Sequence, residues 1–416
     1  MTLAGVQTHR PGGTAKTHWR GTHRVVCPEE TLARLLPHLP AMGITRVGML
    51  TGLDRLGLPV AVAVRPNGRA ISVAQGKGVT PAAAKVSAIM EAAETFHAET
   101  VTGPLHYGTA AEVTHAVDPE RLPVAANGPG RDRAVGDPRL WIPGEDLATG
   151  RERLVPFELV HARYALPAPE PVCFQATTSG LAAGNVAVEA QLHALYEAIE
   201  RDAIACWRSK GGPAKAGTAL NLSTVEDPDL HGLMDGIAQA DVDLVAWDLT
   251  SDAEVPVMIA MLIPRAGERG GVEAELGSGC HLDPSVALSR AITEAAQTRL
   301  TRISGARDDF DPQSYSTEAR RRRRVEAQSW LTLGRRGRVA WTRAITQRWQ
   351  PSADLEADLG AVLDALASIG CGEAVWIDLT RPEIGIPVGR VVVPGLEGPW
   401  LPGLYSPGAR AKAAHP

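Results

Sequence analysis

Residues 189–201 contain the feature that most constrains the fold, an acidic stripe on a segment whose pattern predicts one helix. The stripe consists of Glu189, His193, Glu197 and Glu200. Their spacing places them within an arc of about 80° on one helix face. The adjoining face, with Leu192, Leu195 and Ile199, is apolar and must pack inward. Carboxylates gathered beside a packed face repel one another and are costly to bury without cations, so the helix indicates a metal site.

Two other segments predict helices with the same kind of stripe. One segment places Ser87, Glu91 and Glu94 on one face, and the other segment does the same for Arg290, Glu294 and Gln297. Alanines flank the acids in all three segments, which favours close helix approach over three separately solvated surface helices. Together the helices offer six candidate metal ligands: Glu91, Glu94, Glu189, Glu197, Glu200 and Glu294.

Oxygen ligands in this number favour Mg²⁺, which usually keeps waters and bridges to phosphates. Arg201 and Arg290 are then candidates for bidentate phosphate binding, and His193 and Gln297 are candidate uncharged ligands. The chain has no Walker-type phosphate loop, because Gly76-Lys77-Gly78 lacks the spaced glycine before it and the hydroxyl residue after it. Motifs of dinucleotide-binding folds, zinc proteases and serine hydrolases are also missing. A nucleotide would therefore be held through metals and arginines.

Composition excludes several other classes of protein. The net charge of -5 argues against general nucleic-acid binding. The chain has neither an apolar run long enough to span a membrane nor an apolar signal segment at its N-terminus. Five scattered cysteines without a CxxC pair favour reduced thiols in a cytoplasmic protein. Cys280, in a glycine-flanked loop before a helix, is an alternative catalytic thiol. The arginine run at 320–324 favours a solvated helix face, with an acidic-peptide docking surface as the alternative.

The order of elements predicts an α/β fold with mixed sheets. Strands are expected at residues 60–64, 71–74 and 174–178, and helices begin at Thr80-Pro81 and at Asp283-Pro284. Two similar segments, 247–257 and 377–388, each read Asp-Leu-Thr before an apolar strand, which predicts a duplicated strand–turn–strand unit. Residues 1–18 are polar and are expected to form a disordered tail.

Several motifs in order resemble the YcaO family over roughly residues 20–398. They are Gly76-Lys77-Gly78, the Ser87–Glu94 stripe, Gly180-Leu181-Ala182-Ala183-Gly184-Asn185, the Glu189–Arg201 stripe, the Arg290–Glu294 stripe and Pro394-Gly395-Leu396-Glu397. The resemblance implies a YcaO catalytic domain at 19–400, followed by a C-terminal tail at 401–416. It also implies ATP and Mg²⁺ as cofactors and a homodimer that binds neither nucleic acid nor membrane.

The resemblance assigns roles to individual residues. The six glutamates would bind metal, and Glu200, Arg201, Arg290 and Glu294 would form the catalytic set. The nucleotide would be contacted by Arg24, Thr31, Ser87, Asn185, His193, Arg201, Arg290 and Gln297. Three positions depart from the family pattern. Thr95 stands where Arg is common, Ala182 stands where some relatives have Ser, and His193 replaces a Gln and is expected to make its contact pH-dependent.

The family reaction is activation of a peptide backbone amide: a nucleophile adds to the carbonyl, ATP phosphorylates the resulting oxygen, and phosphate leaves. Azoline-forming members commonly end in a proline-rich tail, which residues 406–416 lack. The first 60 residues leave no room for a fused leader-binding domain. Both features favour a member that works with a separate TfuA-like partner and forms a thioamide on a precursor peptide or protein. An azoline-forming cyclodehydratase and an amidine-forming macrocyclase are the alternatives within the enzyme class. A nucleotide-binding scaffold without catalysis is the alternative from another class.

Overall fold

The computed structural model describes residues 14–162, 172–265, 273–307, 312–337, 339–341, 352–401 and 403–414. The helices are α1 (Pro28–Leu35), α2 (Pro81–Ala98), α3 (Arg131–Gly136), α4 (Ala187–Ser209), α5 (Gly212–Gly217), α6 (Pro228–Gln239), α7 (Pro284–Ser304), α8 (Thr317–Gly334), α10 (Leu355–Ser368) and α11 (Ala409–Ala413). The strands are β1 (Arg46–Met49), β2 (Val60–Val64), β3 (Val73–Lys77), β4 (His106–Gly108), β5 (Arg139–Asp146), β6 (Glu152–Pro156), β7 (Leu181–Ala183), β8 (Leu220–Asn221), β9 (Val242–Asp248), β10 (Val257–Pro264), β11 (Glu275–Cys280), β12 (Val339–Ala340), β13 (Val375–Asp378) and β14 (Val388–Val392).

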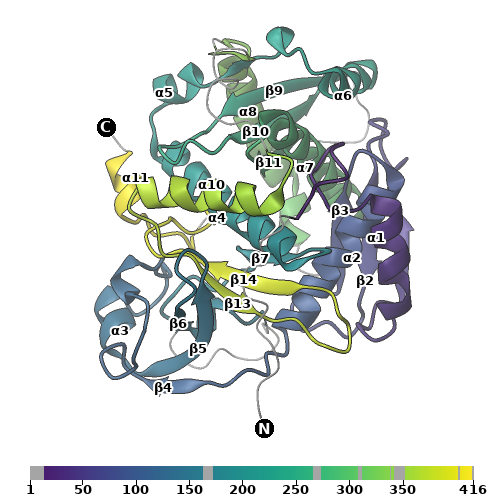
Figure 1. Cartoon of the computed structure of the whole chain (residues 1–416). Coiled ribbons are helices and arrows are strands. Elements are labelled where there is room, and N and C mark those ends of the chain that lie inside the picture. The colour runs from purple at the N-terminus through teal and green to yellow at the C-terminus, as the bar shows by residue number, and fades with distance from the viewer. Residues whose placement is uncertain are drawn as a thin grey trace.

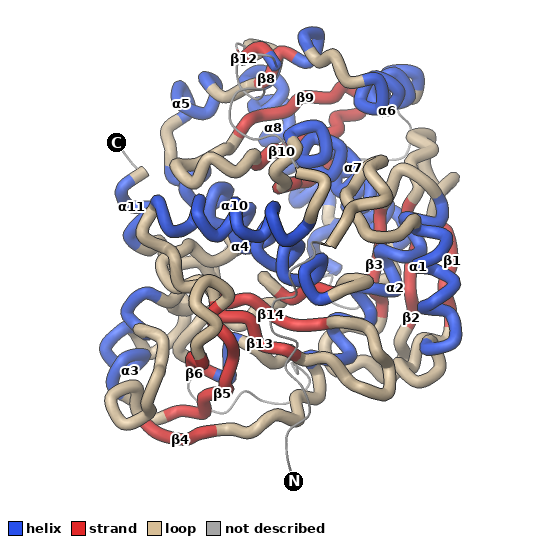
Figure 2. Tube along the Cα trace, viewed as in Figure 1, coloured by secondary structure: helices blue, strands red, loops and turns tan. Residues whose placement is uncertain are grey.

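Three antiparallel sheets surround the central helix α4, as Figures 1 and 2 show. One sheet has the order β1-β2-β3, a second has β11-β10-β9, and the third has β4-β5-β13-β14-β7 with β6 paired to β5. Helix α2 covers the first sheet and α7 covers the second (Figure 1). Helix α4 lies against β14 and β7 on one side and against α10 on another. The mixed α/β class expected from the sequence is confirmed.

The helices α2 and α7 lie directly on glycines of the strands beneath them. A Cβ atom on Gly76 of β3 would lie 2.0 Å from the backbone nitrogen of Ala88. A Cβ atom on Gly277 of β11 would lie 2.1 Å from the backbone nitrogen of Ala295. The alanines beside the acidic stripes therefore allow backbone-to-backbone contact between helix and strand, which brings both stripes toward α4.

The two Asp-Leu-Thr segments form matching hairpins, β9–β10 and β13–β14. The Asp248 carboxylate accepts a hydrogen bond from the backbone of Thr250 at 2.9 Å, and Asp378 does the same for Thr380 at 2.8 Å. Each threonine hydroxyl also accepts a bond from the first residue of the second strand. The repeated sequence therefore specifies a repeated strand–turn–strand structure.

Two local expectations are wrong. The segment 174–178 is not a strand, because Phe174 forms only an isolated bridge to Val124, and the strand is β7 instead. Residues 14–18 are not a free tail, because Lys16 is buried and pairs with Asp358 of the segment that forms α10. Residues 1–13 of the expected tail lie outside the described residues.

Both expected helix starts are confirmed. Thr80 and Asp283 cap α2 and α7 with their side chains, as expected. The arginine run lies on α8, where Arg321, Arg322 and Arg324 are exposed. The C-terminal segment ends in α11, which lies on α4. Among the described residues, no helix is both long and apolar enough to cross a membrane.

Candidate active site

The three acidic stripes meet where α2, α4 and α7 approach the ends of β3 and β11. Glu294 of α7 lies at the centre of this cluster. The Ser278 hydroxyl lies 2.7 Å from Glu200 Oε1 and 3.0 Å from Glu294 Oε1, so it joins α4 to α7. The Lys77 ammonium forms an ion pair with the other Glu294 oxygen and joins β3 to the same point. We use the name carboxylate cluster for five glutamates together with the arginine that pairs with two of them: Glu91, Glu94, Glu197, Glu200, Glu294 and Arg201.

Arg201 binds the two neighbouring acids of its own helix. Its guanidinium lies 3.2 Å from Glu197 Oε1 and 3.1 Å from Glu200 Oε1. Burial would lower the pKa of Arg201, but Glu200 and Glu197 outweigh burial and raise it. Arg201 therefore stays charged, which is the state needed for binding phosphate oxygens.

The two carboxylates of α2, Glu91 and Glu94, have raised pKa values, which means that their ionised form is unfavourable when no cation is bound. Burial raises the pKa of Glu91 to about 7, and the nearby charges of Glu197 and Glu294 add to the effect against Arg307 and Lys77. Burial also raises the pKa of Glu94, together with Glu91 and Glu197, although the Ala183 backbone donates to Glu94 at 2.8 Å. Carboxylates in this state gain stability when a cation binds.

Glu200 and Glu294 share Ser278 but have pKa values pushed in opposite directions. Burial raises the pKa of Glu200, and the negative charge of Glu294 raises it further. Burial also favours a higher pKa for Glu294, but the positive charges of Lys77 and Arg201 outweigh burial and lower the pKa of Glu294. Such a pair is typical of sites that bind charge or move protons.

The donor set suits Mg²⁺ bound together with phosphate. Among the described residues, no three Asp, Glu, His or Cys side chains lie close enough together to hold a metal ion by themselves. Mg²⁺ is commonly held by one or two carboxylates, with waters and substrate phosphates completing its octahedron. The carboxylate cluster could supply the protein oxygens, and Arg201 could contact the phosphates.

Arg290 and Gln297 of α7 have buried polar atoms that lack a partner within the described part of the chain, namely Arg290 Nε and Gln297 Oε1. The Gln297 amide donates to the Gln75 backbone at 3.0 Å. Orphaned buried polar atoms are costly and indicate a missing ligand. Both residues therefore fit their expected place beside a nucleotide. Ser87 lies on α2, where its backbone packs against Gly76.

Glu189 has a different surrounding from the other five acids. It is fully buried, and its oxygens accept bonds from the Val25 backbone at 2.6 Å and from the Asn185 backbone and amide at 2.8 and 3.0 Å. Arg24 lies 3.9 Å from Glu189, and the Thr31 hydroxyl donates to Asn185 at 2.9 Å. Glu189 thus holds the expected nucleotide contacts Arg24, Thr31 and Asn185 together, and its role as a direct metal ligand stays a prediction.

His193 is neutral in the physiological range. Burial lowers its pKa well below the ordinary value, and Arg290, Arg24 and Lys77 lower it further. The pH-dependence that we expected for its contact is therefore displaced to acidic pH. Cys280, the alternative nucleophile, is buried, and burial raises the pKa of its thiol well above the ordinary value, so the thiolate needed for nucleophilic attack is disfavoured.

Sequence reasoning missed two members of the site, Lys77 and Ser278. Both follow a glycine that lies under a helix, Gly76 in Gly76-Lys77-Gly78 and Gly277 in Gly277-Ser278-Gly279. The signal that both positions share is a glycine–polar–glycine triplet. The first triplet is also one of the motifs that resemble the YcaO family, although the resemblance gives Lys77 no role of its own.

This arrangement suits a nucleotide that is held with Mg²⁺ by carboxylates and arginines instead of by a phosphate loop. Residues 75–397 match the family model described as YcaO cyclodehydratase, ATP- and Mg²⁺-binding. The chain belongs to the YcaO family, and ATP and Mg²⁺ are its cofactors.

Relatives match over nearly the whole chain. A protein in the tfuA 3' region of Rhizobium leguminosarum bv. trifolii is 37% identical, and the match covers 95% of this chain and 93% of the relative. A protein of Mycobacterium tuberculosis is 37% identical over 92% of this chain and 84% of its own length. A protein of Methanothermobacter thermautotrophicus is 34% identical over 90% of this chain and 95% of its own length.

Solved structures share the fold. YcaO from Methanopyrus kandleri, bound with AMPPCP and Mg²⁺, matches with a TM-score of 0.73 and 24% identity, over 92% of this chain and 95% of that chain. A heterocyclase in complex with substrate and cofactor matches with a TM-score of 0.75 and 24% identity, over 94% of this chain. The match spans only 54% of the heterocyclase, so that protein contains further chain beyond the shared fold.

Proposed function

We propose that this chain activates a backbone amide of a ribosomally made peptide or protein and converts it to a thioamide. A sulfur nucleophile adds to the amide carbon, the resulting oxygen takes the terminal phosphoryl group of ATP, and phosphate then leaves as the C=S bond forms. An amide oxygen leaves poorly until it is phosphorylated, which is why the reaction consumes ATP. Mg²⁺ would neutralise charge on the phosphates.

The chain's own residues suit this transfer. Phosphoryl transfer depends mainly on positioning and on neutralising charge. Glu91, Glu94, Glu197, Glu200 and Glu294 are the proposed metal-binding side chains. Arg201 and Arg290 are the proposed phosphate contacts, and Lys77 and Ser278 hold Glu294 in place.

The observation that favours the thioamide is the similarity to the Rhizobium protein in the tfuA 3' region. We propose that this chain also works with a TfuA-like partner and that it forms a homodimer. Azoline formation is the second candidate, supported by the word cyclodehydratase in the family description and by the heterocyclase fold. Presence of the whole carboxylate cluster with its arginines argues against a scaffold without catalysis.

The test combines purified chain, TfuA-like partner, candidate peptide, ATP, Mg²⁺ and sulfide, followed by mass spectrometry of the peptide. We expect an ATP-dependent mass gain that corresponds to replacement of one oxygen by sulfur. Loss of one water would instead support azoline or amidine formation. No ATP-dependent change in any combination would contradict both enzyme proposals. A Glu200→Gln sample is the inactive control, and Glu29→Gln on exposed α1 is the matched active control.

A further inference from the structure

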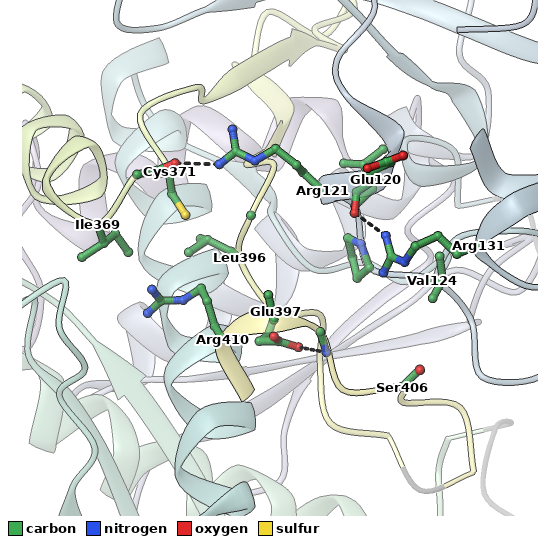
Figure 3. A pocket seen from close by; sticks show the side chains of 16 residues that line it. Glu120, Arg121, Val124, Arg131, Ile369, Cys371, Leu396, Glu397, Ser406 and Arg410 are labelled. Atoms are coloured by element: carbon green, nitrogen blue, oxygen red, sulfur yellow. Dashed lines mark hydrogen bonds between the residues drawn. The ribbon is translucent and has the colours of Figure 1, made fainter. Parts of the chain in front are cut away.

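Two hollows lie on either side of shared lining residues, and Arg201 lines the smaller one. The larger hollow has a volume of about 270 Å³, and its lining includes Arg121, Cys371 and Leu396 (Figure 3). The smaller hollow has a volume of about 70 Å³, and its lining includes Thr177 and Arg201. Both hollows are lined by Leu122, Pro123, Leu396 and Glu397. They therefore share one wall, and the smaller hollow is also lined by Arg201 of the carboxylate cluster.

The wall at residues 395–398 is fixed in place by its glycines. Gly395 has a φ of 106°, and a Cβ atom there would lie 2.7 Å from Arg121 Nη2 and 2.8 Å from Cys371 Sγ. A Cβ atom on Gly398 would lie 2.2 Å from Gln175 Oε1. A larger residue at either position would displace the neighbouring side chain, and at Gly395 it would also have to adopt a left-handed backbone conformation.

Glu397 ties this wall to α4 and to the chain end. Its backbone N–H donates to Asp202, the residue after Arg201, at 2.9 Å. Its carboxylate accepts bonds from the backbones of Gly408 and Ala411 at 2.8 and 2.9 Å, which holds the segment that lines the larger hollow (Figure 3). The two hollows are thus built features whose position is coupled to the helix that carries Arg201.

The lining combines an apolar wall with charged side chains of both signs, because Glu120 and Glu397 line the larger hollow beside Arg121 and Arg131. Leu122, Pro123 and Leu396 supply the apolar wall. Arg121 and Arg131 are exposed and donate only to backbone carbonyls, of Gly370 and Glu120 respectively. Within the described part of the chain no carboxylate pairs with either arginine, so both can bind an additional acidic group.

We infer that the two hollows form the binding groove for an extended peptide substrate. The peptide places an acidic side chain against Arg121 and Arg131, an apolar side chain along Leu396, and the reacting amide at Arg201. This inference rests on the proposed function insofar as the substrate is a peptide. A groove with an apolar wall and a few polar groups is the common form of a ligand site.

The test selects peptides from a pool of random synthetic sequences on the immobilised full-length chain, with AMPPCP and Mg²⁺ present. We expect the wild-type chain to enrich peptides that carry an acidic residue. The double variant Arg121→Glu with Arg131→Glu should bind the enriched peptides about tenfold more weakly, as expected for loss of charge-assisted hydrogen bonds. It should prefer lysine-bearing peptides instead. Thr177→Trp, which fills the smaller hollow, should weaken binding without changing the charge preference.

The matched control is Arg133→Glu, because Arg133 lies on the same short helix α3 but pairs with Asp137 and does not line either hollow. AMPPCP binding, measured in parallel, should be equal in the wild-type chain and in the arginine variants, which shows that these variants are folded. The inference is overturned if the wild-type chain enriches no peptides, or if the double variant binds the enriched peptides as tightly as Arg133→Glu does. Failure of the proposed function looks different, because peptide selection would then persist without any ATP-dependent modification.

Discussion

Helix α4 contributes acids to two clusters that differ in how completely the protein's own groups bind the carboxylate oxygens. On one side, Asp202 accepts bonds from Arg410 at 2.8 and 3.0 Å and from the Glu397 backbone, so both of its oxygens are occupied. On the other side, Glu200 belongs to the carboxylate cluster, where the pKa of Glu91 is raised to about 7 and Arg290 Nε has no partner among the described residues. Glu200 and Asp202 are thus only two residues apart on one helix, but Asp202 belongs to a complete ion pair and Glu200 belongs to the candidate ligand site.

The difference teaches how to recognise a functional cluster of buried acids. A structural cluster brings its own cation in good geometry, as Asp202 and Arg410 do. Burial also raises the pKa of Asp202, so the raised pKa values of Glu91 and Glu94 identify a functional cluster only together with the number of acids that share Lys77 and Arg201. The predictions below separate the two clusters, beginning with the largest expected effect.

Glu200→Gln should abolish most activity while leaving the fold intact. The change removes a charge but keeps the shape and the contact to Ser278, so we expect the rate of ATP-dependent peptide modification to fall by at least about 100-fold. The measurement is the modification rate at saturating ATP. Glu29→Gln on α1 should keep the wild-type rate, and a Glu200→Gln rate within a few-fold of it would contradict the metal assignment.

Arg410→Ala should act mainly on stability. It leaves the Asp202 carboxylate buried without its cation, so we expect the free energy of unfolding to fall by about 3 kcal/mol in urea titrations. Lys412→Ala, on the exposed side of the same helix, is the control and should change it by less than about 0.5 kcal/mol. An equally small effect for Arg410→Ala would show that the chain end is only loosely attached.

His193→Gln should have the smallest effect. Because burial and three cations keep His193 neutral, the profile of activity between about pH 6.5 and 8 should have the same shape in both proteins. Rates measured across that range test this expectation. An inflection near pH 6.5 that disappears in the variant would mean that His193 titrates in the working range.

Much of the site was predictable because its parts are local. The helical period placed Glu91 with Glu94, and Glu197 with Glu200, on common faces without any knowledge of the fold. The adjacent alanines correctly indicated close packing, which the structure realises over Gly76 and Gly277.

Other parts depended on contacts that no local pattern encodes. Lys77 and Ser278 reach Glu294 only because two different strands lie under two helices. Lys16 is ordered because its partner, Asp358, comes from the far end of the chain. The strand expected at 174–178 failed because strand formation depends on a pairing partner, and β14 pairs with β7 instead.

The central claim is that the carboxylate cluster is strained until Mg²⁺ and nucleotide bind, and Glu91→Gln tests it most directly. Folding raises the pKa of Glu91 from 4.5 to about 7. As pH rises, the Glu91 carboxyl therefore loses its proton at lower pH in the unfolded chain than in the folded chain. The free energy of unfolding of the ligand-free protein falls as pH rises between these two values. At pH 8 the variant should therefore be more stable than wild type by about 1–3 kcal/mol without ligand, measured by urea unfolding.

With saturating Mg²⁺ and AMPPCP the order should reverse, because wild type gains binding free energy that the variant largely loses. Glu29→Gln should follow wild type in both conditions. A Glu91→Gln protein that is less stable than wild type without ligand, or that gains as much stability from Mg²⁺ and AMPPCP as wild type does, would contradict the account.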